Sequence, residues 1–153
     1  MKNFSVRLAT DKDSKNIFDW RNDTLTRSMS HSTKIVNWKE HKQWFASSID
    51  SENCSLIICE HDIFNKIAVV RFDLNESGAL ISINLNPSKR GKNLGKESLI
   101  KSIEFFSKKY PSTKKIFAEV NEENIASKKT FLGVGFEKLK VENHIGYYLK
   151  NLI

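Results

Sequence analysis

The sequence is poor in residues that interrupt or cross-link a chain: its 153 residues include two prolines, six glycines and two cysteines. No stretch rich in proline or glycine marks a linker between domains. Cys54 and Cys59 lie five positions apart in an expected strand. This odd separation points them to opposite faces of a sheet, which argues against a disulfide between them. No Cys/His cluster has the spacing of zinc ligands, so we expect no metal site.

Long apolar runs are also missing from the sequence. No segment approaches the length that a membrane-spanning helix requires. Residues 1–7 lack the apolar stretch of a signal peptide. We therefore expect a cytoplasmic protein that does not act on membranes.

The composition is that of a globular protein, with 39% hydrophobic and 28% charged residues. A chain of this length makes one ordinary domain, so we expect a single domain over residues 1–153. The formal net charge of +7 suits an anionic partner. Nucleic acid, a membrane surface, a phosphorylated cofactor or simply a solvated basic surface would all fit this charge.

Hydrophobic periodicity predicts alternating strands and helices along the chain. The expected strands cover about 4–8, 56–58, 67–72, 81–86 and 116–120, and a hairpin lies between 134 and 149. The expected helices cover about 11–23, 37–49, 94–110 and 124–132. This order predicts a three-layer α/β fold, with a mixed central sheet of about seven strands and about four helices.

The segment from Leu85 to Lys96 is the strongest candidate for a ligand site, because a basic, glycine-containing loop stands between a strand and a helix. Free backbone N–H groups at the start of a helix attract phosphate. Gly91 and Gly95 allow a ligand to approach the backbone closely. The loop cations are Lys89, Arg90, Lys92 and Lys96. The loop matches neither a Walker A motif nor a dinucleotide-binding fingerprint.

Two motifs resemble those of the GNAT superfamily of N-acetyltransferases. Residues 90–95 resemble its pyrophosphate loop, Arg/Gln-x-x-Gly-x-Gly/Ala, with Asn93 in place of the middle glycine. Asparagine tolerates a positive φ better than other non-glycine residues, so the loop shape is retained. Further along the chain, Asn124, Ser127, Phe131 and the pair Gly135-Phe136 follow the spacing of a second family motif.

The resemblance implies an acetyl-CoA-dependent N-acetyltransferase that acts on a primary amine. It implies the following cofactor-binding residues: Ile83, Asn84, Leu85, Arg90, Gly91, Lys92, Asn93, Leu94, Gly95, Lys96, Asn124, Ser127 and Phe131. Asn124 would also serve catalysis by bonding the cofactor or a water molecule. A domain that binds coenzyme A without catalysis remains an alternative.

The catalytic groups are less regular than the cofactor loop. Phe131 occupies the position of the family's usual tyrosine acid and cannot donate a proton. Tyr147 or Tyr148 on the last strand could replace it. For the general base we select Glu119, since some family members have a glutamate at this spacing before the asparagine. Asp73 is an alternative base, and a solvated strand carboxylate is the alternative role for Glu119.

Three segments resemble acetyltransferases of nucleotide-linked amino sugars, in particular the UDP-4-amino-sugar enzymes of the pseudaminic acid pathway. These segments are 20–23, 41–45 and 69–73. The resemblance predicts substrate contacts from Arg21, Asn22, His41, Trp44 and Arg71. His41 and the tryptophans could instead be core residues. Related Trp-Arg-Asn segments occur in acetyltransferases of ribosomal protein N-termini, so peptide acetylation is the rival activity.

Nucleic-acid binding would require basic residues and aromatic residues on one face. The lysines are scattered apart from the loop at 89–96 and a second cluster at 108–115. We therefore expect a small-molecule substrate and no nucleic-acid partner, and leave a homodimer open.

Overall fold

A single seven-stranded sheet runs through the computed structural model, which describes residues 3–152. The predicted domain covers residues 1–153, and the N-terminal segment considered above covers residues 1–7. Of these, residues 1, 2 and 153 lie outside the described residues. The strand order is β1-β2-β3-β4-β5-β7-β6, and only the β4–β5 pair is parallel. The strands are β1 (Phe4–Leu8), β2 (Cys54–His61), β3 (Asn65–Asn75), β4 (Gly78–Leu85), β5 (Lys115–Asn121), β6 (Glu137–Glu142) and β7 (Ile145–Asn151).

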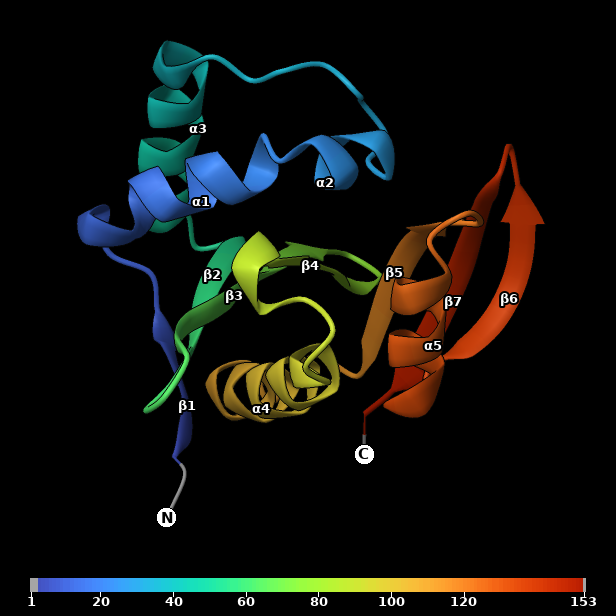
Figure 1. The fold of residues 1–153 in the computed structure, drawn as a ribbon. Coiled ribbons are helices and arrows are strands. Elements are labelled where there is room, and N and C mark those ends of the chain that lie inside the picture. Colours follow the sequence, from blue (N-terminus) through green and yellow to red (C-terminus); the bar gives the residue numbers. More distant parts are fainter. Residues whose placement is uncertain (1–2, 153) are drawn as a thin grey trace.

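Helices cover both faces of the sheet, so the predicted three-layer fold with seven strands is confirmed (Figure 1). One face carries α1 (Ser14–Arg21), α2 (Thr24–Ser28) and α3 (Trp38–Asp50), and the other carries α4 (Leu94–Lys109) and α5 (Ile125–Gly133). Short 3₁₀ helices precede α1 (η1, Asp11–Asp13) and α4 (η2, Pro87–Lys89). Within residues 3–152, no helix is long and apolar enough to cross a membrane.

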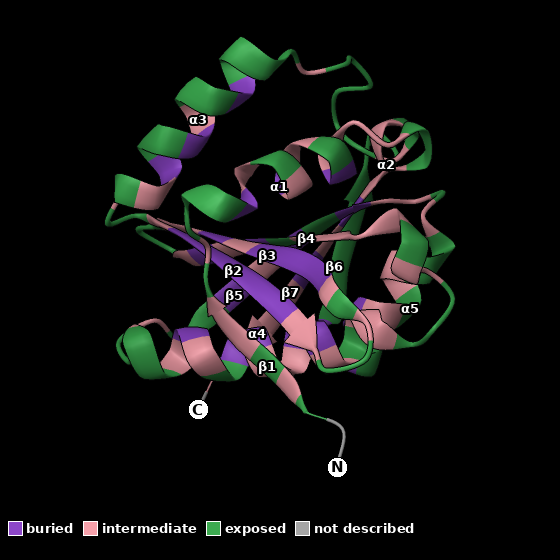
Figure 2. Cartoon of the chain, turned by 60° about the vertical axis from the view of Figure 1, so that its left-hand side comes forward, coloured by how far each residue is buried: buried purple, intermediate pink, exposed green. Residues whose placement is uncertain are grey.

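The sheet separates two hydrophobic clusters, and its central strands are the most buried part of the molecule (Figure 2). The larger cluster packs the sheet against α4, where the rings of Phe72 and Phe106 stack with centroids 4.2 Å apart. The smaller cluster packs β2 and β3 against α1 and α3. Cys59 belongs to the first cluster and Cys54 borders the second. The two thiols therefore face opposite sides of the sheet, as their spacing predicted, and both are free.

The first predicted helix differs from the observed structure. Instead of one helix over 11–23, the chain forms η1 and α1, turns at Asn22, and starts α2 at Thr24. Asp23 leaves the helical conformation, with φ −54° and ψ 137°, and its carboxylate accepts a hydrogen bond from the Thr26 N–H at 3.1 Å. This is a helix N-cap, which starts a new helix in a new direction. Since α2 has only five residues and no buried side chain, hydrophobic periodicity could not reveal it.

The sheet opens between β4 and β5. Their parallel pairing covers only Ala79 to Ile81 on β4 and Ile116 to Ala118 on β5. Beyond this point β4 remains paired with β3 as far as Leu85, while β5 remains paired with β7 as far as Asn121. Residues 82–85 therefore have a strand on one side only, and β4 and β5 diverge in Figure 1.

A buried carboxylate fastens α1 to the sheet. Asp13 is fully buried and accepts two hydrogen bonds from the Arg7 guanidinium, at 2.7 and 2.9 Å. The Lys66 ammonium lies 2.7 Å from the same carboxylate, and the Thr10 N–H donates to it at 2.8 Å. Burial alone would raise the pKa of Asp13, but these bonds outweigh burial and hold the pKa well below its usual value.

Asp13→Asn is expected to reduce the free energy of unfolding at pH 7 by about 1–3 kcal/mol, because Arg7 and Lys66 lose their charged partner. The folded protein stabilises the ionised form of Asp13. Its contribution is therefore present above the unfolded pKa of about 3.9 and is lost as the pH falls below that value. Urea denaturation at pH 7 and pH 3 should show the difference between wild type and variant shrinking at the lower pH.

Asp19→Asn is the matched control, since Asp19 forms only an exposed pair with Lys15. Its substitution should change stability by less than about 1 kcal/mol. Equal effects of the two substitutions would contradict the role of Asp13.

Candidate active site

The opening between β4 and β5 exposes the edge of β4. Along a strand, alternate residues direct their N–H and C=O groups to the same side. Within residues 82–85, half of these groups therefore face the opening, where an extended ligand could bond them. The predicted cofactor-binding residues Ile83, Asn84 and Leu85 all lie on this segment. Ile83 and Leu85 also pack against the core on the α4 side.

The predicted phosphate loop leads from η2 into α4. Gly91 has a φ of 74° and Asn93 a φ of 59°, so the positive φ expected at Asn93 is confirmed. Asn93 is the N-cap of α4, yet its side chain makes no capping hydrogen bond. In contrast, Asn37 and Asn124 cap α3 and α5 with their side chains. The N–H groups of Leu94, Gly95 and Lys96 therefore receive no side-chain cap and suit a phosphate ligand.

The loop cations have different surroundings. Lys89 and Lys92 place their ammonium groups 5.9 and 5.7 Å from the ring centre of Phe64. Lys96 is exposed near the start of α4. Arg90 instead points to α2, where it pairs with Asp23 and donates to the Thr26 hydroxyl at 2.9 Å. The sequence grouped these four cations, but the structure separates Arg90 from the rest.

The opposite wall carries the second family motif. Asn124 caps α5 by accepting a hydrogen bond from the Ser127 N–H at 3.1 Å. Both residues lie at the first turn of α5 and are partly exposed. Phe131 is only 3% exposed and packs edge-to-face on Phe136, with ring centres 5.1 Å apart. Its side chain thus belongs to the core. Little of its surface is exposed for the predicted contact with the cofactor.

Glu119 lies where the opening begins. It follows Ala118, the last β5 residue paired with β4, and its side chain is 32% exposed. Directly across the β5–β7 pair is Tyr147, on the same face of the sheet. Tyr148 occupies the other face and is fully buried. Of the two tyrosines considered as acids, only Tyr147 shares the side of Glu119.

His31 is a site residue that sequence reasoning missed. It stands between α2 and α3, and its Nε2 lies 3.4 Å from the Glu119 carboxylate. The side chain is 62% exposed. No motif or periodicity surrounds His31 in the sequence, and it lies 88 positions before Glu119, so only the fold brings the two residues together.

Three of the predicted substrate-binding residues meet at Trp44. The guanidinium carbons of Arg21 and Arg71 lie 5.0 and 5.2 Å from the centre of its ring system. Such cation–π contacts orient both guanidinium groups. The carboxylate of Asp73 lies 2.9 Å from Arg71 Nε, so this alternative base is occupied by an ion pair. Burial, followed by repulsion from Arg71, lowers the pKa of Arg21.

The other two predicted substrate residues have structural contacts. Asn22 donates to the Val36 carbonyl at 2.8 Å and accepts from the Val36 N–H at 2.9 Å. His41 is fully buried among aromatic rings, and its Nε2 donates to the Ser14 carbonyl at 2.9 Å. Burial lowers the pKa of His41. The predicted substrate contact of His41 is therefore wrong for this structure, because the side chain reaches no surface; the core alternative describes it.

The sheet register relates the arginine cluster to Glu119. Arg71 pairs with Ser82 on β4, and Ser82 and Glu119 are the next positions after the last parallel pair, Ile81 and Ala118. Arg71, Ser82 and Glu119 thus lie on one face of neighbouring strands. Arg71 and Glu119 are therefore at least two strand spacings apart, on the order of 10 Å or more, because β4 and β5 diverge at this point. An acceptor could therefore contact both.

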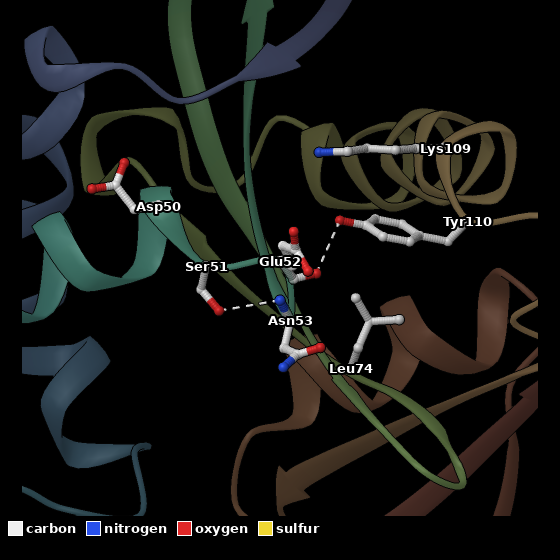
Figure 3. Close-up of a pocket in the computed structure, with 7 residues that line it drawn as sticks. All are labelled: Asp50, Ser51, Glu52, Asn53, Leu74, Lys109 and Tyr110. Atoms are coloured by element: carbon white, nitrogen blue, oxygen red, sulfur yellow. Dashed lines mark hydrogen bonds between the residues drawn. The ribbon is translucent and has the colours of Figure 1, made fainter.

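One surface hollow lies away from these residues. A hollow of about 570 Å³ lies among Asp50, Ser51, Glu52, Asn53, Leu74, Lys109 and Tyr110, at the other end of the strands (Figure 3). Its polar groups are used locally: Ser51 Oγ accepts from the Asn53 N–H at 3.1 Å, and the Tyr110 hydroxyl donates to the Glu52 carbonyl at 3.5 Å. It contains none of the predicted site residues.

Comparison with known proteins decides the family. Residues 4–137 match the model of the acetyltransferase (GNAT) domain. The chain belongs to the GNAT acetyltransferase family. The resemblance found in the loop and in the α5 motif is thereby confirmed at the level of the family.

Two matches come from Methanocaldococcus jannaschii, one in sequence and one in structure. The chain is 28% identical over 138 residues to an uncharacterized protein of Methanocaldococcus jannaschii, a match that covers 88% of this chain and 28% of that protein. The chain thus spans under a third of the relative's length. A crystal structure of a domain from the same organism is 26% identical, covers 99% of this chain and 100% of that one, and has a TM-score of 0.86.

Two further solved enzymes share the fold at lower identity. Spermidine N-acetyltransferase from Vibrio cholerae, in complex with CoA and spermine, is 18% identical, with a TM-score of 0.83 and coverage of 97% and 95%. The Campylobacter jejuni N-acetyltransferase PseH, in complex with acetyl coenzyme A, is 14% identical, with a TM-score of 0.74 and coverage of 97% and 99%.

Proposed function

We propose that this GNAT domain transfers the acetyl group of acetyl-CoA to a primary amine of a nucleotide-linked amino sugar, most simply a UDP-linked one used in surface-glycan synthesis. The main support for a nucleotide-linked acceptor is the pair of guanidinium groups, from Arg21 and Arg71, that lie beside Trp44. They lie on the face of the sheet that also bears Glu119.

The residues around the opening suit acetyl-CoA. The α4 N–H groups without a side-chain cap, together with Lys92 and Lys96, would hold its pyrophosphate. The free edge of β4 would bond its extended amide arm, as an added strand would. The cofactor supplies a thioester-bound acetyl group. Both solved enzymes with the same fold described above contain coenzyme A or its acetyl form, which supports this assignment.

Glu119 would accept the proton of the attacking amine, directly or through water. Its partial exposure and its place at the mouth of the opening allow both routes. Phe131 cannot protonate the departing sulfur. A thiol has a pKa of about 8.5, so a thiolate can leave without an acid. Tyr147 is the hydroxyl on the same face that could donate a proton afterwards.

The charges at Trp44 favour an anionic acceptor over a polyamine. Asp73 balances Arg71, but the Arg21 guanidinium has no ion pair or hydrogen bond to another residue of the described chain. A diphosphate would relieve the repulsion between the two arginines by charge-assisted bonds. The nucleotide would then position the amine against the thioester through remote binding energy.

Gly95→Val should lower the affinity for acetyl-CoA by about tenfold or more, since one lost charged contact costs about 1.5–3 kcal/mol. A Cβ at Gly95 would meet Thr130 at 3.5 Å and Leu85 at 3.9 Å, which is ordinary contact, so the variant should fold. If the pyrophosphate lies against the backbone at the start of α4, a side chain at Gly95 would hinder its close approach. Calorimetry measures the affinity, and an unchanged value in a folded variant would place the cofactor elsewhere.

Glu119→Gln should reduce turnover by about 10²–10⁴-fold if Glu119 is the base, because the amide keeps the size of the side chain but cannot accept the proton. The low-pH limb of kcat/KM should change as well. Glu123→Gln is the matched control, since Glu123 is exposed just after β5. A normal pH profile with near-normal turnover would remove Glu119 from the mechanism and make Asp73 the next candidate.

The acceptor is tested by comparing a UDP-4-amino sugar with the same sugar lacking its nucleotide, reading the mass gain of one acetyl group. The intact nucleotide sugar should react with the higher kcat/KM. Arg21→Gln should lower this value by about one to two decades for the nucleotide sugar and leave the free sugar unaffected. Lys39→Gln, on the exposed side of α3, is the control.

Equal reaction of the free sugar would refute the nucleotide-linked acceptor. Acetylation of only spermidine or only peptides in the same assay would replace it with the corresponding amine class. In either case the assignment to the GNAT family would stand, because it rests on the match over residues 4–137.

A further inference from the structure

Arg90 is the first residue of the predicted phosphate loop. Its guanidinium contacts Asp23, a residue 67 positions earlier in the sequence. Its Nη2 contacts the Asp23 carboxylate and donates to the Thr26 hydroxyl at 2.9 Å. The side chains of Arg90 and Asp23 are 33% and 23% exposed, so the pair is shielded from water for most of its surface. Such a shielded, charge-assisted contact is stronger than an exposed ion pair.

Asp23 has a second task, because it caps α2. The same carboxylate oxygen accepts from the Thr26 N–H at 3.1 Å and from the Thr26 hydroxyl at 3.2 Å. The hydrogen bond from Arg90 is the largest cause that lowers the pKa of Asp23. One carboxylate therefore holds both the first turn of α2 and the first residue of the phosphate loop.

The neighbouring residues extend this connection to the segment before α3. Asn22 bonds both backbone groups of Val36. Arg27 donates to the Asn22 carbonyl at 3.1 Å and to the Thr33 carbonyl at 3.0 Å. Arg21 and His31 lie on the same connected stretch, one beside Trp44 and the other beside Glu119.

We propose that Arg90 is a positioning residue that couples the phosphate loop to the acceptor side, and that its side chain is not a phosphate ligand. The Arg90–Asp23 pair holds α2 and the segment through Val36 over the opening. Coenzyme A bound at the loop would order α2 through this pair, and an acceptor would in turn favour the bound loop, because coupling between sites is reciprocal. The acceptor part of this inference rests on the proposed function.

The competing role is direct phosphate binding by the Arg90 side chain. The two roles predict different behaviour for Asp23→Asn, which keeps an oxygen to cap α2 but removes the charge facing Arg90. If Arg90 binds phosphate, freeing it should maintain or strengthen coenzyme A affinity. If Arg90 couples the two sides, Asp23→Asn should reproduce the effect of Arg90→Gln.

The experiment compares Arg90→Gln, Asp23→Asn and the double variant. Each single variant should raise the acceptor KM by about 3- to 30-fold, the range for one charged hydrogen bond, with kcat much less affected. The double variant should be no worse than either single, as expected for two groups that act as a unit. Coenzyme A affinity by calorimetry should change by less than about threefold.

Lys92→Gln is the matched control from the same loop, because Lys92 lies near Phe64 and not at α2. It should weaken coenzyme A binding and leave the acceptor KM unchanged. Thr26→Val removes the second contact of Arg90 while keeping the ion pair, and should give a smaller increase in acceptor KM than Arg90→Gln.

Hydrogen exchange provides a readout that needs no acceptor. Coenzyme A should slow amide exchange in α2 of the wild type, and this slowing should be lost in Arg90→Gln and Asp23→Asn. A tenfold or larger loss of coenzyme A affinity in Arg90→Gln alone, or α2 protection that persists in both variants, would overturn the coupling. Failure of the UDP-sugar assay would refute the proposed acceptor but would leave the exchange result to decide this inference.

Discussion

The parallel pairing of β4 with β5 stops after Ile81 and Ala118, and the candidate site depends on this limit. The closed end is held by buried side chains, among them Ala79 and Ile116. At the open end each strand keeps its outer partner, β3 for β4 and β7 for β5, so the backbone of both strands remains ordered. Strand twist then separates two halves of the sheet that are each stable. The opening is thus a property of the fold and needs no strained loop.

In the proposed site, donor and acceptor are recognised by different parts of the chain. On the donor side, backbone groups of β4 and of the α4 N-terminus would bind the cofactor, and Asn93 in place of glycine keeps the positive φ that this requires. On the acceptor side, the side chains of Arg21 and Arg71 at Trp44 would bind the substrate. Backbone recognition depends on φ and ψ, whereas side-chain recognition depends on residue identity, so specificity within the family is expected to reside in α1, α3 and β3.

Much of the fold followed from local pattern. The helix over 94–110 was predicted from apolar residues at helical spacing and is observed from Leu94 to Lys109. The left-handed conformation of Asn93 followed from residue type. The short helix α2 was missed, because its start is set by the side chain of Asp23 and not by an apolar face. The sequence did not distinguish between a substrate contact and a core position for His41. A histidine at helical spacing from aromatic residues gives the same sequence pattern in both cases.

The alternation of strands and helices, the glycine-containing loop before α4 and the resemblance to the GNAT family could be predicted from the sequence, because these depend on residue type and spacing within short segments. The long-range contacts could be seen only in the folded protein: His31 with Glu119, Arg90 with Asp23, and the two arginines with Trp44. The register of the sheet also decided that Tyr147, and not Tyr148, shares the face of Glu119. These contacts join positions that are far apart in the chain, and their geometry is set by how the helical layers pack on the sheet, which no local pattern encodes.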